Sequence, residues 1–422
     1  MRKVLIRTGA ACLVGLAATP AAAQVVIEGQ GVADRPRPDY DAVGSPFLGS
    51  WRAYPSIWLI GEATDNYLAT DTNRRSDAYL SVVPEVYFKD NGGPNRLEAH
   101  AFFSQSVHAN LPNENAASGG VSISSAYEPA RDTQLRADIS AAHYVESRSS
   151  LGAFQAAADP VKFEAYHAGL GVTHSFVDLS LGLNAALDRD QFHDTHLANG
   201  TPIDQDYRDV RTATVGATAN YALRNGIGLV LSGSYVDERY DLRPGKNGFS
   251  PLTNIDRDSS GYNITGGVSL ELTHLVFGTI QVGYLSRNYT DPRLNDFSGL
   301  SFSGDVLWNV TPLTSLRFRA SRSVQDTSST FIAGNTRSDF RVSVDHELYR
   351  YIILSGDAFY GHFSPNGPGI GGDEYSVGAS ARYLIDRRYS VSGGVRHSGR
   401  SSDAQALRYQ ANYLTLSFRA AF

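Results

Sequence analysis

Apolar and polar side chains alternate along almost the whole chain after residue 55, and this pattern narrows the possible folds more than any other feature. In residues 177–188 (VDLSLGLNAALD), every second residue from Val177 to Leu187 is apolar, and the residues between them from Asp178 to Asn184 are polar or glycine. The same alternation recurs in 316–321, 340–345 and 375–382. A period of two predicts strands with one apolar and one polar face.

The connections between these segments alternate between short and long. Six short turns rich in Pro, Asp, Asn and Arg fall at 128–132, 173–175, 223–225, 311–312, 348–350 and 385–387. Long polar loops fall between them at 146–160, 193–209, 241–260 and 364–373. This order predicts an all-β, transmembrane, up-and-down antiparallel β-barrel over residues 56–422, with short turns in the periplasm and long loops outside. Counting hairpins gives about 18 strands, and 16 to 20 would fit strands of roughly 9–11 residues within the membrane.

A secreted soluble β-sandwich would also alternate, but it would vary its connections and seldom exceed about 250 residues as one domain. No apolar run reaches the roughly 18 residues of a membrane-spanning helix. A sheet that spans lipid must close because no backbone hydrogen bond can be left open there. The regular meander therefore favours the closed barrel.

Residues 1–23 have the pattern of a secretory signal peptide, with a basic start, a short apolar run and a small-residue end. Cys12, the only cysteine, lies within this segment, so the mature chain would contain no disulfide and no thiolate metal site. The formal net charge of −6 becomes −9 once Arg2, Lys3 and Arg7 are removed with it. An acidic chain of this kind argues against nucleic acid as a partner.

The end of the sequence continues the alternation. Leu414, Leu416, Phe418 and Phe422 share one face, and the final phenylalanine resembles the terminal recognition signature of outer-membrane barrels. This resemblance implies outer-membrane lipid and the barrel assembly machinery as partners. Tyrosines near predicted strand ends fit the aromatic girdles at the two interfaces: Tyr221, Tyr262, Tyr284, Tyr360, Tyr383 and Tyr413.

The segment before the first predicted strand, RPRPDYDAVGSPFLGSW, contains a more specific motif. Its elements are Arg35, Pro36, Arg37 and Pro38, then Tyr40 and Asp41 with Gly44, then Gly49, Ser50 and Trp51; Asp65-Asn66, Ser76-Asp77 and Pro84 follow. This order resembles the opening of the putative β-barrel porin 2 family, although Ala63 and the Ser45-Pro46-Phe47 step depart from the family pattern. The resemblance implies an outer-membrane pore of a Gram-negative cell. Members, and similar barrels of exopolysaccharide operons, are linked to export of surface polysaccharide, which implies periplasmic export components or the polysaccharide as partners.

Residues 24–55 are predicted to form an extended periplasmic lead, because Pro36, Pro38 and Pro46 disfavour helix and favour extended backbone. Three roles remain open for it. It is a disordered leader that keeps the first strand accessible for assembly, a plug that enters the lumen, or a contact for a periplasmic partner.

Catalytic and metal motifs are weak. There is no Gly-x-Ser-x-Gly elbow and no cysteine nucleophile, so neither an enzyme nor a cofactor is predicted. His193 and His196 have metal-like spacing, but no third ligand is evident in the sequence, and a solvated loop is favoured. Acidic residues at Asp204, Asp206 and Asp209, or at Asp256 and Asp258, are interpreted as hydrated loop charges rather than a Ca²⁺ site. No metal site is predicted.

The polar strand faces carry many arginines and aspartates. The predicted pore-lining residues are Asp305, Arg317, Arg319, Asp339, Arg341, Asp345, Arg382, Arg396 and Arg419. They form either a charged constriction that selects anionic or sugar solutes or a lattice of Arg–Asp pairs that braces the wall. Tyr409 and Tyr413 are also predicted to face inward, as an aromatic path for sugars or as wall filling.

The predicted function is a passive, non-enzymatic conduit through a polar lumen, for surface or exopolysaccharide export. Two alternatives remain: a general small-solute diffusion porin, and a closed structural or adhesive barrel that acts through its extracellular loops.

Overall fold

The computed structural model describes residues 31–90, 95–224, 226–246, 248–250, 254–273, 275–325, 334–367 and 369–422. The predicted signal peptide, residues 1–23, and the first part of the predicted lead, residues 24–30, lie outside the described residues.

The described chain forms one sheet of 19 strands in which a two-residue strand, β1 (Ser45–Pro46), accompanies the long strands of the barrel wall. Two further short strands, β9 (Thr195–His196) and β10 (Pro202–Ile203), form a separate hairpin. The long strands are β2 (Trp51–Thr64), β3 (Asp77–Asp90), β4 (Arg96–His108), β5 (Ala116–Ala130), β6 (Thr133–Val145), β7 (Lys162–Ser175), β8 (Leu179–Phe192), β11 (Val210–Ala222), β12 (Ile227–Tyr240), β13 (Ser259–Leu272), β14 (Val276–Tyr289), β15 (Phe297–Thr311), β16 (Thr314–Gln325), β17 (Asn335–Tyr349), β18 (Ile352–Pro365), β19 (Gly372–Leu384), β20 (Tyr389–Ser402) and β21 (Tyr409–Ala421). Single 3₁₀ turns occur at η1 (Val32–Asp34), η2 (Pro112–Glu114), η3 (Asp206–Arg208) and η4 (Gln405–Leu407).

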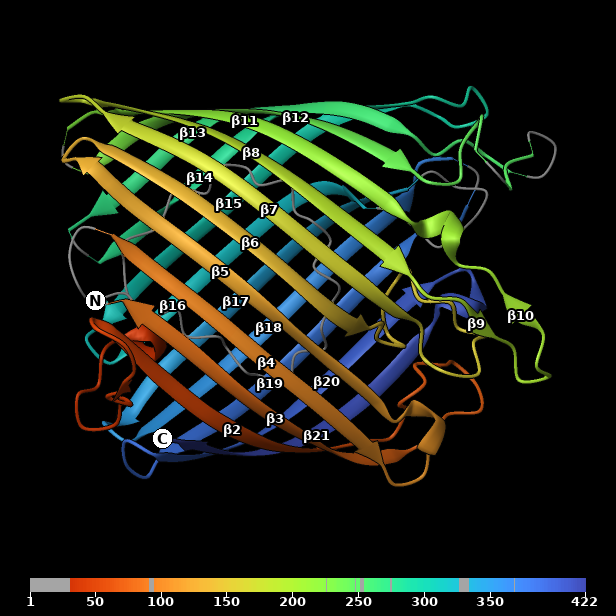
Figure 1. Ribbon diagram of the computed structural model, residues 1–422, viewed down its shortest axis with the longest axis horizontal. Coiled ribbons are helices and arrows are strands. Elements are labelled where there is room, and N and C mark those ends of the chain that lie inside the picture. The colour runs from red at the N-terminus through yellow and green to blue at the C-terminus, as the bar shows by residue number, and fades with distance from the viewer. Residues whose placement is uncertain are drawn as a thin grey trace.

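Each long strand pairs antiparallel with its neighbours, and the wall closes where β2 pairs with β21 from Ser56↔Ala421 to Thr64↔Tyr413. The result is an 18-stranded up-and-down barrel, as the sequence predicts. Short turns and the C-terminus lie at one end, on the left of Figure 1, and long loops lie at the other. No helix in the described part of the chain is long and apolar enough to cross a membrane.

The two faces of the wall differ as the alternation predicts. Leu183, Leu231, Val282 and Leu416 are 58–62% exposed on the outer face, whereas polar residues of the inner face, such as Ser301, are buried. Exposed tyrosines form a girdle near each end of the strands: Tyr166, Tyr235, Tyr262, Tyr284 and Tyr360 toward the long loops, and Tyr127, Tyr221, Tyr349, Tyr351, Tyr383 and Tyr389 toward the short turns. An apolar band between aromatic girdles is the outer surface of a membrane-spanning barrel. Tyr413 does not belong to it, because it faces inward and packs with Ala69 and Tyr409.

Several predicted boundaries differ from the structure by a few residues, and two of them have a clear reason. The first long strand begins at Trp51, five residues before the predicted start at 56. A proline disrupts a sheet only where the backbone N–H that it lacks would have made a hydrogen bond. Pro55 lies before the β2–β21 pairing begins at Ser56, so the strand can run through it. Its carbonyl oxygen still accepts a hydrogen bond from the Phe422 N–H at 2.9 Å. Residues 173–175 are strand rather than turn, because β7 continues to Ser175.

Four of the connections at the long-loop end are L2 (109–115), L3 (146–161), L4 (193–209) and L6 (290–296). By the usual orientation of such barrels this end is extracellular.

Candidate functional site

The barrel encloses a cavity of about 1110 Å³. Its wall comes mainly from β6–β8, β11–β13 and β16–β20, and L3 forms part of its lining near the long-loop end. Ala33 and Asp34, from the segment that precedes the first strand, also line it. Serine hydroxyls are frequent on its surface, for example at Ser149, Ser343 and Ser376. The cavity is therefore a polar lumen narrowed by two segments that are not strands.

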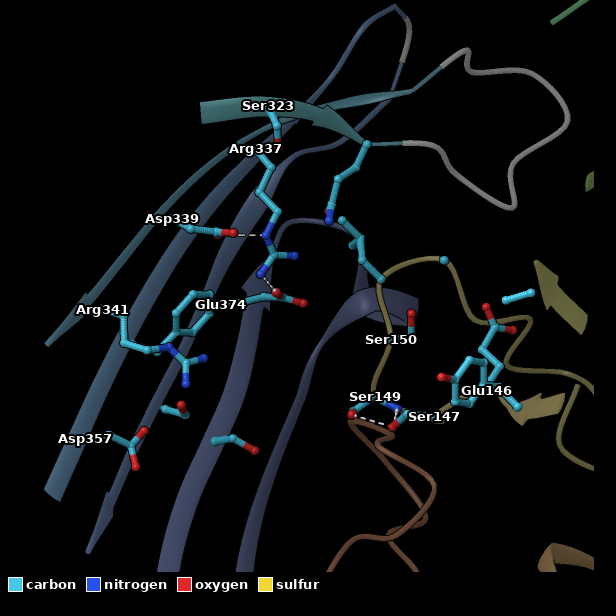
Figure 2. A pocket seen from close by; sticks show the side chains of 18 of the residues that line it. Glu146, Ser147, Ser149, Ser150, Ser323, Arg337, Asp339, Arg341, Asp357 and Glu374 are labelled. Carbon is cyan, nitrogen blue, oxygen red and sulfur yellow. Dashed lines mark hydrogen bonds and ion pairs between the residues drawn. The ribbon is translucent and has the colours of Figure 1, made fainter. Parts of the chain in front are cut away.

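L3 folds inward and reaches the opposite wall. Its Ser149 carbonyl oxygen accepts a hydrogen bond of 2.6 Å from Arg400 Nη2 on β20. Figure 2 shows Ser147, Ser149 and Ser150 of L3 on one side of the space and Arg337 and Glu374 on the other. A loop held across a barrel in this way reduces the opening of the lumen and places neutral hydroxyl groups opposite charged ones.

Two buried ion pairs fasten the start of L3. Arg148 donates two hydrogen bonds to Glu114 of L2, at 2.6 and 3.1 Å, and a third to the Ala157 carbonyl oxygen at 3.0 Å. The Arg148 and Glu114 side chains are 6% and 4% exposed. Breaking a buried pair costs about 3–5 kcal/mol because one charge is left without a partner.

Glu146, the first residue of L3, is held by an ion pair with Arg208 of L4. Arg208 donates to Glu146 at 2.6 and 3.2 Å, and its guanidinium lies 3.8 Å from the centre of the Phe192 ring. Both ion pairs hold the start of L3, and the hydrogen bond from Arg148 to Ala157 ties the two flanks of its inward turn together.

The wall opposite L3 carries a ladder of arginines and carboxylates. Arg337 contacts Asp339 at 2.7 Å and Glu374 at 2.5 Å, and Arg400 also contacts Glu374 at 2.5 Å. Arg341, two residues after Asp339 on β17, is exposed to the lumen and lies 5.1 Å from the centre of the Phe359 ring. Among the described residues, Arg341 makes no ion pair within 4.0 Å, so its N–H groups face the open space (Figure 2).

The predicted pore-lining residues fall into two groups. Five of them line the cavity: Asp339, Arg341, Asp345, Arg382 and Arg396. Asp305, Arg317 and Arg319 instead form a cluster nearer the short-turn end, with Arg317–Asp305 at 2.5 Å and Arg319–Asp305 at 3.4 Å. Arg419 lies 5.4 Å from the Trp58 ring. The first group fits a charged constriction, and the second fits a wall braced by pairs.

Other lumen residues were not apparent from the sequence. L3 has the composition of an ordinary polar loop, and nothing local in the sequence indicates that Arg400 contacts it or that Glu374 pairs with Arg400. On the far wall, His167 contacts Asp138 and Asp188, each at 2.6 Å, and brings three strands together. The alternation in the sequence indicates that these side chains face the lumen, but which residues they contact depends on the strand register.

The start of the described lead, the 3₁₀ turn η1, lies inside the lumen at the short-turn end, whereas Phe47 and Leu48 further along it are 62% and 73% exposed. Val32 is fully buried, and its N–H donates to Ser315 Oγ at 2.9 Å. Arg35 donates to the Pro312 carbonyl oxygen, and Arg37 forms an ion pair of 2.8 Å with Glu347 on β17. Arg387 donates to the Pro38 carbonyl oxygen at 2.8 Å.

The residues of the N-terminal motif join the lead to the first strand. Tyr40 and Asp41 close a turn onto the Arg37 carbonyl oxygen, at 2.8 and 2.7 Å. Gly44 and Gly49 have positive φ values of 72° and 58°. At Gly44 a Cβ would lie 2.6 Å from the Tyr54 ring, so only glycine fits this turn. Pro36 lies between the two anchored arginines. The motif thus shapes the return of the chain from the lumen to the wall.

The acidic loop residues separate into two kinds. Asp256 and Asp258 are buried, and Asp258 accepts the Tyr240 N–H at 2.7 Å and pairs with Arg239 at 3.3 Å. Asp204 and Asp206 approach Asp194, with carboxylate oxygens within 4.8 Å of one another. Burial, with Asp204 and Asp194 nearby, raises the pKa of Asp206.

Asp209, the third residue of the acidic group predicted in L4, lies apart from that cluster and accepts the Phe192 N–H at 2.7 Å. In L6, by contrast, hydrogen bonds from Arg293 lower the pKa of Asp291 to about 2.

His193 and His196 do not converge. His196 Nε2 lies 3.6 Å from Asp159 in L3, whereas His193 Nε2 lies 3.3 Å from Glu164 on β7. The sequence offered no third ligand near this pair; the structure places Glu164 and His143 beside His193 instead.

The C-terminal residues lie where the alternation places them. Leu414 and Leu416 are 60% and 62% exposed on the outer face, and Phe418 stacks on Tyr389 with ring centres 5.9 Å apart. Phe422 is 63% exposed at the closing seam of the wall.

Comparison with known proteins places the chain among outer-membrane barrels. The family model "Putative beta-barrel porin 2" matches residues 37–422. No curated protein matches the sequence. Among solved structures, the siderophore receptor PirA from Acinetobacter baumannii is similar at 8% identity and a TM-score of 0.49, covering 90% of this chain and 81% of that one.

Two other solved structures align with this chain over nearly the whole of their own length. OpdK from Pseudomonas aeruginosa, solved with vanillate, is 13% identical with a TM-score of 0.43, and covers 88% of this chain and 99% of that chain. OccAB4 from Acinetobacter baumannii is 9% identical with a TM-score of 0.44, over 88% and 98%. The family match over the whole barrel wall carries the assignment: this chain belongs to the Putative beta-barrel porin 2 family of outer-membrane proteins.

Proposed function

We propose that this barrel is a passive diffusion channel for small polar solutes, with a preference for carboxylated and sugar-like ones. The observation that carries the proposal is the constriction between L3 and the ladder on β17 and β19, where Ser147, Ser149 and Ser150 face Arg337 and Glu374 across the lumen. No covalent step and no cofactor is part of it.

Arg341 is the residue that we propose contacts the solute. Its guanidinium is exposed and lies 5.1 Å from the Phe359 ring, while Arg337 next to it is already paired with two carboxylates. A planar guanidinium with open N–H groups binds a carboxylate through two parallel hydrogen bonds. Serine hydroxyls on the opposite side offer donors and acceptors of the kind that sugars use.

Export of a surface polysaccharide is the second candidate. It is favoured by the family membership and by a lining that contains serines and aromatic rings, such as Phe163 and Phe359. A polymer chain needs a wider opening than a small solute, so this function requires L3 to leave its bond to Arg400. The two candidates therefore differ in whether L3 must move.

We also propose that the lead narrows the periplasmic side of the same channel. Ala33 and Asp34 line the cavity, and Val32 is fully buried against the wall. A segment in this position restricts the lumen from below while the wall stays closed.

The test is single-channel conductance of refolded residues 24–422 in a planar bilayer, before and after addition of an acidic oligosaccharide such as oligogalacturonate or a neutral maltooligosaccharide. We expect stable conductance that the acidic sugar blocks at lower concentration than the neutral one. Protein shown to be folded that conducts no current would overturn the channel proposal.

Arg341→Gln tests the selectivity. The reversal potential in a salt gradient should shift toward cations, and block by the acidic oligosaccharide should weaken by about tenfold, the effect of losing one charged hydrogen-bonding group. Arg74→Gln is the matched control, because it removes the same charge from an exposed residue outside the constriction, in the loop between β2 and β3, where Arg74 Nε donates to the Asp71 carbonyl oxygen at 3.4 Å. Equal shifts in both variants would mean that Arg341 acts only through total charge.

A further inference from the structure

The geometry points to a binding site for a divalent transition-metal ion, of the Zn²⁺ type, on the outer rim of the barrel. Its ligands are His143 at the end of β6, Glu164 near the start of β7 and His193 at the start of L4. One ligand atom from each lies within 4.8 Å of the other two. The site is independent of the lumen and of the proposed channel.

The strand register brings two of these ligands together. His143 and Glu164 are direct partners across the β6–β7 pairing, and the His143 Nδ1–Glu164 Oε1 distance is 2.8 Å. His193 follows the last residue of β8, and its backbone N–H donates to the Lys162 carbonyl oxygen at 2.9 Å. Its Nε2 then lies 3.3 Å from the same Glu164 oxygen. The backbone therefore fixes all three positions.

The donor set suits the metal class. Two imidazoles and one carboxylate form a three-ligand set that Zn²⁺ uses with a further open position, at metal–ligand distances of about 2.0–2.2 Å. Glu164 Oε1 lies 2.8 Å from His143 Nδ1 and 3.3 Å from His193 Nε2, which is the spacing of neighbouring ligand atoms around one such ion. A calcium ion would prefer more oxygen ligands and no imidazole.

The location leaves the site open to solvent. Glu164 is two residues beyond Tyr166 of the girdle on the same outer face, and is thus above the apolar band. The His143, Glu164 and His193 side chains are 35%, 29% and 53% exposed. An ion can reach the site from outside, and water can complete its coordination.

A bound ion would join β6, β7 and the first residue of L4. The last turn of L4 carries Arg208, which holds Glu146 at the start of L3. Metal binding should therefore order L4 and reduce amide exchange in residues 193–209, whether or not the barrel conducts.

The test is titration of folded, chelator-treated protein with Co²⁺ followed by its visible absorption, and with Zn²⁺ in competition. We expect one equivalent of Co²⁺ with intense low-coordination bands, displaced by Zn²⁺. His143→Asn, Glu164→Gln and His193→Asn should each weaken binding by more than the roughly 10–100-fold that loss of an outer partner costs. Heat-dependent gel migration would verify that each variant is folded.

Two control variants remove a histidine without touching the site. His362 on β18 pairs with Asp373 on β19, which also accepts a hydrogen bond from Tyr360, and His196 lies near Asp159. His362→Asn and His196→Asn should retain the full equivalent. Wild-type protein without a stoichiometric Co²⁺ spectrum, or ligand variants that bind as well as the controls, would overturn the proposal.

Discussion

The two ends of the lumen are narrowed by different means. At the extracellular end, L3 is held by a nearly fully buried Arg148–Glu114 pair and by the Arg208–Glu146 pair, whose side chains are 8% and 10% exposed. At the periplasmic end, the described part of the lead is held by the Arg37–Glu347 ion pair, with side chains 10% and 16% exposed, and by hydrogen bonds to single carbonyl, amide and hydroxyl oxygens.

This difference predicts different strengths. Charges that are buried together are costly to separate, whereas single hydrogen bonds to charged groups contribute about 1.5–3 kcal/mol each. L3 should behave as a fixed part of the channel, and the lead as a segment that can be released.

The largest effect is expected from Arg148→Met, which leaves Glu114 buried without its partner. L3 should lose its inward position, and single-channel conductance should rise about twofold or more, because pore diameter limits conduction. Arg96→Met is the matched control, since its pair with Glu128 is exposed and such pairs contribute about 0–1 kcal/mol. If both variants conduct like the wild type, L3 does not limit the channel.

A smaller effect is expected from Glu347→Gln, which weakens the anchor of the lead while L3 stays in place. Because the mature chain would contain no cysteine, Val32→Cys provides a single reporter at a fully buried position. Its modification by a membrane-impermeant thiol reagent should be about tenfold faster in the Glu347→Gln background, as expected for the loss of roughly 1.4 kcal/mol.

Conductance gives the second measurement on the lead. We expect a rise of less than about twofold in Glu347→Gln, and a similar or larger rise after deletion of residues 24–38. A rise equal to that of Arg148→Met would remove the distinction between the two ends. Rapid modification of Val32→Cys in the wild-type background would show that the lead is not held.

The smallest effect concerns acid sensitivity among the extracellular loops. Hydrogen bonds from Arg293 lower the pKa of Asp291 in L6 to about 2, and Asp291 also accepts the Asp256 N–H at 3.1 Å. Since the usual value is about 3.9, its stabilisation of L6 is present above about pH 4 and is lost as the pH falls through about 2. Pepsin cleavage at L6 should therefore increase between pH 4 and pH 2.

Asp291→Asn and Asp206→Asn separate this effect from general acid damage. Asp291→Asn should make L6 sensitive to pepsin already at pH 4. In L4, burial and neighbouring acids raise the pKa of Asp206, so its charge destabilises the loop as the pH rises, and the amide should not increase cleavage. Equal cleavage of L4 and L6 in all variants would contradict the assignment.

Strand content and direction were predictable because they depend on local pattern. The period-two alternation at 177–188 gives β8 and its neighbours, and the inward parity of Arg341 and Asp345 follows from the same rule. The turn at Gly44 was visible in the motif, but not the Tyr54 ring that requires a glycine there. The barrel was predicted to start at residue 56 rather than at Trp51 because of Pro55. The sequence alone does not show whether a proline lies where no N–H is needed or where it ends a strand.

The sequence by itself determined a closed barrel of about 18 strands, with a polar interior and an apolar exterior, because alternation and connection length are properties of neighbouring residues. Only the tertiary structure decided which polar residues meet. Arg400 and Ser149 are 251 positions apart, and Arg37 and Glu347 are 310 apart. Their contacts arise from the closure of the wall and from loops that fold inward. Pairing of side chains across a lumen depends on register and loop conformation, which no local pattern encodes.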